Sequence, residues 1–241
     1  MNLAFDGGAQ AWSMRFLADT LSALNLSCGV AAMVAAAHGR IDLSLALLLA
    51  GAGFDAADGM AARRFGGSRF GVLADDIADG VTNGLAPAVA LGFVLGGGQA
   101  IAIGVLYAAF TLARLAFFTL NKGEDDDGFR GIPSTAGAAI VLAALVLFPS
   151  SPALVGLLTG AACVLMTAFD AHYVHLGRVV AKSRRARGAV LAFLVTLVAA
   201  AVAVGPWLAA ALLLTATLAY ALGPIPKSFR RALERRAARP A

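Results

Sequence analysis

The chain contains few charged residues. Lysine, arginine, aspartate and glutamate together make up 14% of its 241 residues, whereas a soluble domain has about 25%. Hydrophobic residues account for 60% of the chain, and the mean hydropathy is +0.81. A soluble fold of this length would need far more polar surface, so the composition excludes a soluble globular protein and indicates a membrane protein.

Cysteine is also scarce. Cys28 and Cys163 are the two cysteines, and both lie in apolar stretches. They provide neither a disulfide framework nor a metal-ligand spacing, so we interpret them as small core residues. The N-terminal segment has few cations and includes Asp6, which does not fit the pattern of a cleavable signal peptide.

Long apolar runs are abundant and predict an all-α, polytopic membrane helix bundle with about eight transmembrane helices. Glycine and proline mark the breaks between the runs. We expect the fifth and seventh helices to be short for a full crossing. The predicted helices lie near residues 17–37, 43–63, 70–96, 99–120, 134–149, 152–172, 188–204 and 206–223.

Lysine and arginine are concentrated in loops that fall on one side of the membrane if the spans alternate. With the N-terminus inside, only Arg40 falls outside, so the positive-inside rule predicts that both termini are cytoplasmic. Most of the net charge of +5 comes from this bias. Attraction to anionic lipid head groups explains the basic residues, and we expect no nucleic-acid partner.

These features divide the chain into three parts. Residues 1–16 mix aromatic and polar side chains, which suits an interfacial helix on the inner leaflet or a disordered start. We expect residues 17–223 to form one transmembrane domain and residues 224–241 to form a basic cytoplasmic tail.

Four aspartates occur at helical spacing inside two of the apolar runs. Asp55 and Asp58 are three residues apart on the second predicted helix, and Asp75 and Asp79 are four apart on the third, so each pair shares a helix face. The segment between the two helices is short, which makes them antiparallel neighbours with all four carboxylates at similar depth. Ionised side chains in a membrane persist mainly where they bind ions, substrates or each other.

This spacing predicts a metal site. Four converging carboxylates would repel one another strongly in a low dielectric, and one or two divalent cations would neutralise them. Magnesium or manganese fits an all-oxygen site that also binds a nucleotide diphosphate. A buried helix-packing ion pair would explain one aspartate but not four at this spacing.

Small residues accompany the aspartates and leave room for a bulky ligand. Gly59 and Gly71 lack side chains beside the predicted cluster, and Ala62 is also small. Arg63 lies two helical turns beyond Asp55, where it can reach a phosphate or pair with an aspartate.

The run Asp55-x2-Asp58-Gly59-x2-Ala62-Arg63-x7-Gly71-x3-Asp75-x3-Asp79 resembles the signature of the CDP-alcohol phosphatidyltransferases. This resemblance implies a six-helix catalytic core that transfers a phosphatidyl or phosphoalcohol group from a CDP-linked donor to an alcohol and releases CMP. It implies that the four aspartates bind two Mg²⁺ or Mn²⁺ ions and that Asp79 is also the general base. It further implies that Gly59, Ala62, Arg63 and Gly71 shape the CDP site, and that the protein is a homodimer.

Further segments resemble the membrane-integral phosphatidylserine synthases of this family. Leu24-Asn25-Leu26-Ser27-Cys28-Gly29 is similar to an element of their first span, and we add Ser22 and Asn25 to the predicted CDP site. Three later segments, at 84–87, 113–118 and 129–133, are also similar to elements of this branch. The resemblance spans roughly residues 19–140.

The chain departs from that branch near the predicted acceptor site. Asp76 replaces a usual serine, Thr82-Asn83 replaces Ser-Phe, and Ala18-Asp19 replaces Pro-Asn. Asp76 can hold an ammonium group or polyol hydroxyls, or it can point away from the metals. We add Asp76, Asn83, Arg114 and Arg130 as candidate contacts to the acceptor or to phosphate. Arg114 suits a carboxylate or a phosphate in fork geometry, and a solvated loop cation is the alternative for Arg130.

We therefore expect transfer of the phosphatidyl group from CDP-diacylglycerol to L-serine in a bacterial inner or cell membrane, with a cytoplasmic active site. The alternative acceptors are glycerol phosphate, an inositol compound and choline. A cation or proton transporter would instead distribute its acids along a path through the bilayer. A non-catalytic scaffold would be served by small-residue packing such as Gly92-x3-Gly96, but it leaves the aspartate spacing unexplained.

Overall fold

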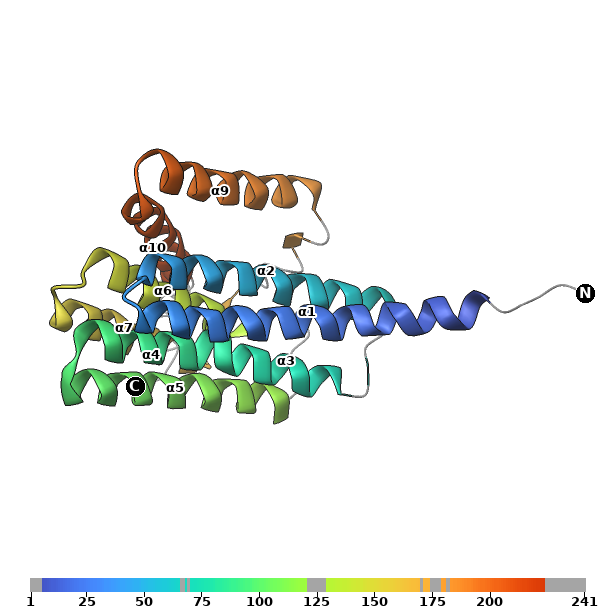
Figure 1. The fold of residues 1–241 in the computed structure, drawn as a ribbon, viewed down its shortest axis with the longest axis horizontal. Helices are drawn as coiled ribbons and strands as arrows, with labels where there is room; N and C mark the ends of the chain where they lie inside the picture. Colours follow the sequence, from blue (N-terminus) through green and yellow to red (C-terminus); the bar gives the residue numbers. More distant parts are fainter. Residues whose placement is uncertain are drawn as a thin grey trace, which may run out of the picture. The chain divides into compact units, whose positions relative to one another are not determined.

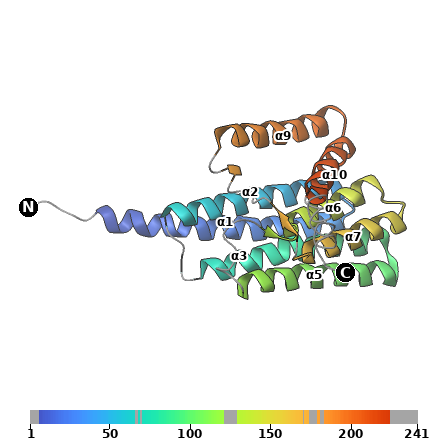
Figure 2. The ribbon, with the colours of Figure 1, turned by 180° about the vertical axis from the view of Figure 1, so that it is seen from behind.

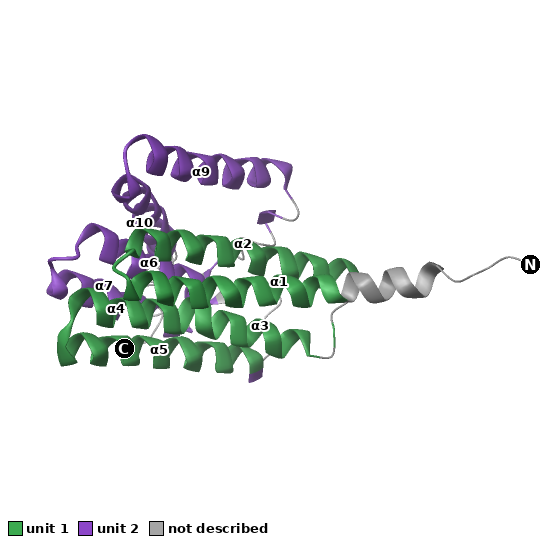
Figure 3. Cartoon of the chain, viewed as in Figure 1, with its two compact units in different colours: residues 1–119 green, residues 120–241 purple. Residues whose placement is uncertain are grey.

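The computed structural model describes residues 6–65, 68, 70–120, 129–169, 171–173, 179–180 and 183–223. The chain divides into two compact units, residues 1–119 and residues 120–241 (Figure 3). The first unit contains α1 (Asp6–Ala37), α2 (Ile41–Phe65), α3 (Gly71–Asp79), the π-helix η1 (Gly80–Leu85), α4 (Ala86–Leu95) and α5 (Gly97–Leu120). The second contains β1 (Phe129–Arg130), α6 (Ser134–Leu147), α7 (Pro152–Thr167), β2 (His172–Tyr173), α9 (Arg184–Ala203) and α10 (Pro206–Leu222).

The structure confirms the predicted all-α polytopic membrane fold. Because α3, η1 and α4 run on without a break, each unit contributes four helical segments to the described residues, and these match the eight predicted ranges. Five segments are long and apolar enough to cross a membrane: Phe16–Ala37, Ile41–Phe65, Gly71–Leu95, Gly97–Leu120 and Arg184–Ala203. The predicted cytoplasmic tail lies outside the described residues.

The prediction of which helices are short was partly wrong. The seventh helix, α9, has 20 residues and begins at Arg184 rather than near 188. It begins earlier because the side chain of Ser183 caps it, accepting a hydrogen bond from the Ala186 backbone N–H at 3.2 Å. The short apolar helices are α6, α7 and α10, and α7 ends at Thr167 rather than near 172.

Helix α1 packs against α2, α3, η1 and α4 in the first unit (Figures 1 and 2). Glycine permits this close packing. A Cβ atom on Gly29 would lie 2.5 Å from Thr82 Oγ1 and 2.8 Å from Thr82 Cα, so no side chain fits there. Thr82 Oγ1 also donates a hydrogen bond to the backbone carbonyl of Asn25 at 3.0 Å, which fixes η1 against α1.

The π-helix η1 follows from a proline. In an α-helix the backbone N–H of residue 87 would donate to the carbonyl of Asn83, but Pro87 has no N–H. The helix widens here, and the Ala86 N–H donates to the carbonyl of Val81, five residues back. The hydroxyl of Tyr107 on α5 donates to the freed Asn83 carbonyl at 2.8 Å. The sequence predicted one regular helix over 70–96 and missed this segment.

Backbone hydrogen bonds connect residues 129–133 to other segments of the second unit. β1 pairs antiparallel with β2, with Arg130 opposite His172. Gly131 adopts a positive φ of 71° and donates from its N–H to the Ala171 carbonyl at 2.9 Å. Ile132 donates to the carbonyl of Leu165 at 3.0 Å, which joins this segment to the end of α7.

The glycine positions of α5 provide a test of this packing. A Cβ atom on Gly104 would lie 2.6 Å from the Ala88 carbonyl oxygen on α4, whereas one on Gly98 would meet nothing within 4 Å. We predict that Gly104→Ala lowers the free energy of unfolding by about 1–3 kcal/mol through overpacking. Gly98→Ala is the matched control and leaves stability unchanged or slightly raised. Thermal unfolding in detergent measures both, and equal stabilities would contradict the α4–α5 contact.

Candidate functional site

Three of the four predicted aspartates converge in the first unit. Asp55 on α2 and Asp75 and Asp79 on α3 each offer a carboxylate oxygen, and these oxygens all lie within 4.8 Å of one another. Each side chain is half-buried. The prediction that the two helices face their acids toward each other is therefore correct for these three residues.

The three carboxylates lack a cationic partner in the described part of the chain. The ion pair found there joins Arg40 to Asp42 at 3.4 Å, at the other end of α2. Oδ1 of Asp75 is buried and accepts no hydrogen bond from any described residue. Two like charges 4 Å apart repel by about 4 kcal/mol even at an effective dielectric near 20, so a cation would stabilise this arrangement.

The donor set fits a hard divalent ion. Carboxylate oxygens are the ligands that Mg²⁺ and Mn²⁺ prefer, and ligands on opposite sides of one Mg²⁺ are about 4 Å apart. A separation of up to 4.8 Å between the three oxygens therefore suits one ion after a small contraction, or a pair of ions. The residues present thus fit the metal that the sequence predicted.

Asp79 differs from the other two because amide groups hold one of its oxygens. Asn25 on α1 donates from Nδ2 to Asp79 Oδ1 at 3.2 Å, and Asn83 on η1 donates from Nδ2 to the same oxygen at 3.1 Å. The sequence predicted Asn25 as a CDP contact and Asn83 as an acceptor contact. The structure places the amide of each on the carboxylate instead, and the substrate contacts stay predictions.

Asp58 lies outside the group of three. Its side chain is 5% exposed, and its Oδ2 accepts a hydrogen bond from the Ser22 hydroxyl on α1 at 2.7 Å. Ser22, a predicted CDP contact, therefore orients Asp58. The role of Asp58 as a metal ligand stays a prediction.

Polar side chains lie next to two of the predicted glycines. The guanidinium of Arg63 folds back over Gly59, where a Cβ atom would lie 3.4 Å from its Nη1. Gly71 faces Asp19 on α1, and a Cβ there would lie 3.3 Å from Asp19 Oδ1. Ser68 donates to that same oxygen at 2.9 Å. Ala62 is half-buried on α2, between the two glycine positions in sequence.

The candidate acceptor contacts have different surroundings in the structure. Asp76 Oδ2 accepts a hydrogen bond from Thr119 on α5 at 2.9 Å. Arg114 is 4% exposed, and its Cζ lies 4.6 Å from the centre of the Phe118 ring. Arg130 belongs to the second unit, where its backbone is in β1. A contact between the acceptor and any of these residues stays a prediction.

Sequence reasoning missed two residues that support the site. Asp19 was interpreted only as a departure from a family pattern, yet its carboxylate lies against Gly71 and Ser68. Tyr107 was overlooked although it is fully buried and binds the Asn83 carbonyl. Its signal was the spacing of Tyr107, Thr111 and Arg114, which places three polar side chains on one face of α5.

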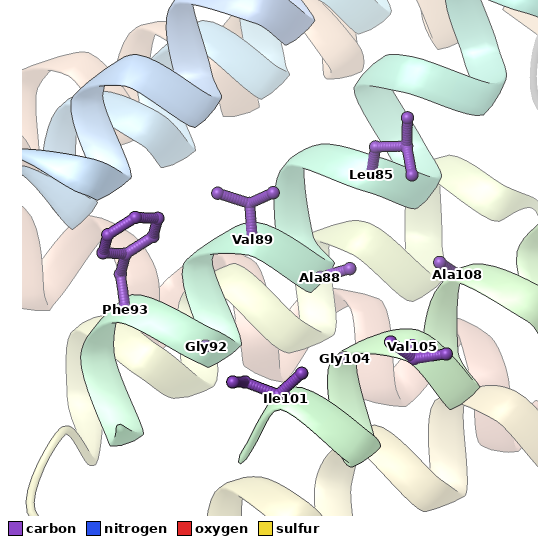
Figure 4. A pocket seen from close by; sticks show the side chains of 9 residues that line it. All are labelled: Leu85, Ala88, Val89, Gly92, Phe93, Ile101, Gly104, Val105 and Ala108. Atoms are coloured by element: carbon purple, nitrogen blue, oxygen red, sulfur yellow. The ribbon is translucent and has the colours of Figure 1, made fainter. Parts of the chain in front are cut away.

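A separate hollow in the first unit is lined by apolar residues. It has a volume of about 420 Å³ and is lined by residues of α4 and α5, among them Val89, Phe93, Ile101 and Val105 (Figure 4). Its lining includes none of the predicted site residues. The side chains that line this hollow offer no acid, base or metal ligand.

Comparison with known proteins identifies the class. The profile of the CDP-alcohol phosphatidyltransferase family matches residues 15–169, which include all four aspartates and the helices that carry them. The chain belongs to this family, and the resemblance drawn from the aspartate spacing is confirmed.

Similar curated proteins carry one name. A CDP-diacylglycerol–serine O-phosphatidyltransferase of Mycobacterium leprae is 31% identical over 150 residues, which cover 57% of this chain and 49% of that protein. A protein of the same name from Helicobacter pylori is 30% identical over 134 residues, covering 54% of this chain and 56% of the relative. The chain therefore spans about half the length of the curated relatives it matches.

Charge removal in the carboxylate group provides a test of the metal site. We predict that Asp55→Asn or Asp75→Asn lowers Mn²⁺ affinity on the order of tenfold or more, because even outer-shell partners have effects of that size. The same variants raise the thermal stability of the metal-free protein, because they relieve repulsion between like charges.

The control is Asp42→Asn, which removes an exposed carboxylate about 20 Å along α2 from Asp55 and leaves Mn²⁺ binding unchanged. Electron paramagnetic resonance of Mn²⁺ and thermal unfolding measure the two effects. Unchanged Mn²⁺ affinity in Asp55→Asn and Asp75→Asn would contradict the site.

Proposed function

We propose that this chain transfers the phosphatidyl group of CDP-diacylglycerol to the hydroxyl of L-serine, giving phosphatidylserine and CMP. The observation that carries the proposal is the convergence of Asp55, Asp75 and Asp79 within a chain of this family. The names of the similar proteins favour serine as the acceptor.

The reaction is an in-line displacement at phosphorus. The serine oxygen forms a bond to the phosphorus that carries diacylglycerol, and the bond from that phosphorus to the CMP oxygen breaks. CMP leaves with the electron pair, and the hydroxyl proton moves to Asp79. A free hydroxyl is a poor nucleophile, which is why a carboxylate placed to accept its proton accelerates the step.

The residues that would hold Mg²⁺ or Mn²⁺ are Asp55, Asp58, Asp75 and Asp79, and we propose two ions. The ions supply electrostatic stabilisation of the charge on the transferring phosphate and on departing CMP. Asp79 has one oxygen, Oδ1, held by two amides, which leaves Oδ2 for the proton. The carboxylates themselves fix the depth at which the diphosphate binds.

We propose that the CDP group lies along α2 and the start of α3. Gly59, Ala62 and Gly71 leave room for it there, and the exposed Arg63 can contact a phosphate. Ser22 and Asn25 line the same region from α1, where they contact Asp58 and Asp79. The donor would enter sideways from the lipid, because its acyl chains remain in the bilayer.

The same chemistry serves another alcohol, and this is the alternative function. Glycerol phosphate, an inositol compound or choline would replace serine. Asp76 sits next to the metal group in sequence and binds Thr119, so its carboxylate is a candidate for an ammonium group or for polyol hydroxyls. Arg114 and Arg130 are the candidates for an acceptor carboxylate or a phosphate.

The proposal includes the setting of the enzyme. The cation distribution favours a cytoplasmic active site and cytoplasmic termini in a bacterial membrane. A homodimer is the assembly that the family resemblance implies. Cysteines introduced into loops on each side of the membrane would test the orientation, because a membrane-impermeant thiol reagent labels only those on the outer side.

An acceptor panel tests the reaction. Purified protein with CDP-diacylglycerol is expected to release CMP when L-serine and Mg²⁺ or Mn²⁺ are both present, and not after chelation of the metal. Release with a different alcohol at a higher kcat/KM would assign the alternative acceptor. Ion flux in liposomes without CMP release would instead indicate a transporter.

The role of Asp79 has its own test. We predict that Asp79→Asn lowers kcat by about 10²- to 10⁴-fold, the contribution typical of a general base, while much of the donor binding remains. CMP release gives kcat, and binding of CDP-diacylglycerol is measured separately. Near-normal turnover of this variant would remove Asp79 as the base.

A further inference from the structure

Two asparagine amides converge on a single oxygen of Asp79. Asn25 and Asn83 come from different segments, α1 and η1, and they are 1% and 2% exposed. Their Nδ2 atoms lie 3.2 Å and 3.1 Å from Asp79 Oδ1. Hydrogen bonds to a carboxylate are charge-assisted and directional, so the pair fixes how this side chain is turned.

The backbone around each asparagine is itself fixed. Thr82 Oγ1 donates to the Asn25 carbonyl at 3.0 Å, which joins the two segments that carry the amides. The fully buried Tyr107 donates to the Asn83 carbonyl that Pro87 leaves free. The π-helix therefore follows from Pro87 and is compensated by Tyr107 on α5, and Asn83 within it lies four residues beyond Asp79, where its amide reaches the carboxylate.

Gly51 on α2 determines the space for Asn25. A Cβ atom on Gly51 would lie 2.8 Å from Asn25 Oδ1 and 3.0 Å from Thr82 Cγ2. Any side chain at this position would push the Asn25 amide away from its place. Gly53, two residues further along the same helix, has nothing within 4 Å of a Cβ.

We propose that Asn25 and Asn83 are positioning residues for the transfer reaction, and that Tyr107 acts through Asn83. They hold Oδ1 of Asp79 so that Oδ2 faces the acceptor hydroxyl and receives its proton. This inference rests on the proposed function. It replaces direct substrate contact as the main role of the two asparagines, because their amide groups are already directed to Asp79.

The decisive variants are Asn25→Leu and Asn83→Leu, which keep the shape of the side chain and remove the amide. We expect kcat to fall about ten- to a hundredfold, the usual effect of losing a partner that orients a site ligand. The KM for CDP-diacylglycerol is expected to stay within about twofold, because an interaction used mainly in the transition state leaves it unchanged. Thermal stability, measured on the same samples, reports whether the variants are folded.

Two further variants change residues that support the asparagines and leave the asparagines themselves intact. Tyr107→Phe keeps the buried ring and loses the hydroxyl, and we expect kcat to fall about fivefold. Gly51→Ala displaces Asn25 and is expected to lower kcat as well. Gly53→Ala is its matched control on α2 and is expected to retain wild-type kcat and KM.

Infrared spectroscopy tests the positioning without turnover. In protein labelled with ¹³C-aspartate, the band lost in Asp79→Asn identifies the Asp79 carboxylate. That band is expected to shift in Asn25→Leu, Asn83→Leu and Gly51→Ala, because Oδ1 loses donors. It is expected to stay in place in Gly53→Ala.

The outcomes separate this inference from the proposed function. If the wild-type protein releases no CMP, the function fails, and the infrared band alone decides the positioning. If wild type is active but the asparagine variants raise KM and keep kcat, the asparagines bind substrate and the inference is overturned. Unchanged kcat in these variants, or an unchanged Asp79 band, overturns it as well.

Discussion

Mutual repulsion between half-buried carboxylates is the constraint on which the first unit depends. Asp55, Asp75 and Asp79 bring three acidic oxygens within 4.8 Å of one another, an arrangement that costs free energy unless something compensates it. Helix packing alone would select against such a cluster, since apolar residues would fill the same space at lower cost. The hydroxyl of Ser22 and the amides of Asn25 and Asn83 donate hydrogen bonds to Asp58 and Asp79 and so fix the orientation of these carboxylates.

The four aspartates have different surroundings although the sequence makes them look equivalent. Asp58 accepts from Ser22, Asp79 accepts from two asparagines, and Asp75 keeps one buried oxygen without a donor among the described residues. Such differences suit different roles for the carboxylates, in which all of them can bind metal ions and one of them also accepts a proton. The side chains of α1, which carries no aspartate of the group, create most of this difference.

Much of the fold was predictable because its signals are local. Apolar runs predicted the eight helical segments, and the three- and four-residue spacings predicted that the acids share faces. The π-helix was not predictable from hydropathy, because it arises from a missing N–H at Pro87 that is compensated by Tyr107, twenty residues away in sequence. The amide contacts of Asn25 and Asn83 were missed for a similar reason. Sequence showed polar residues near the acids, but only the packing of α1 against η1 shows which way their amides turn.

The π-helix also sets the rotation of everything that follows it. One additional residue in a turn advances the chain by about 100° relative to a continuous α-helix. The rotation introduced at η1 therefore determines that the face of α4 with Ala88 meets Gly104 of α5. A helical wheel drawn straight through residues 70–96 assigns these faces wrongly, because each residue after η1 lies about 100° from the position that a continuous α-helix would give it.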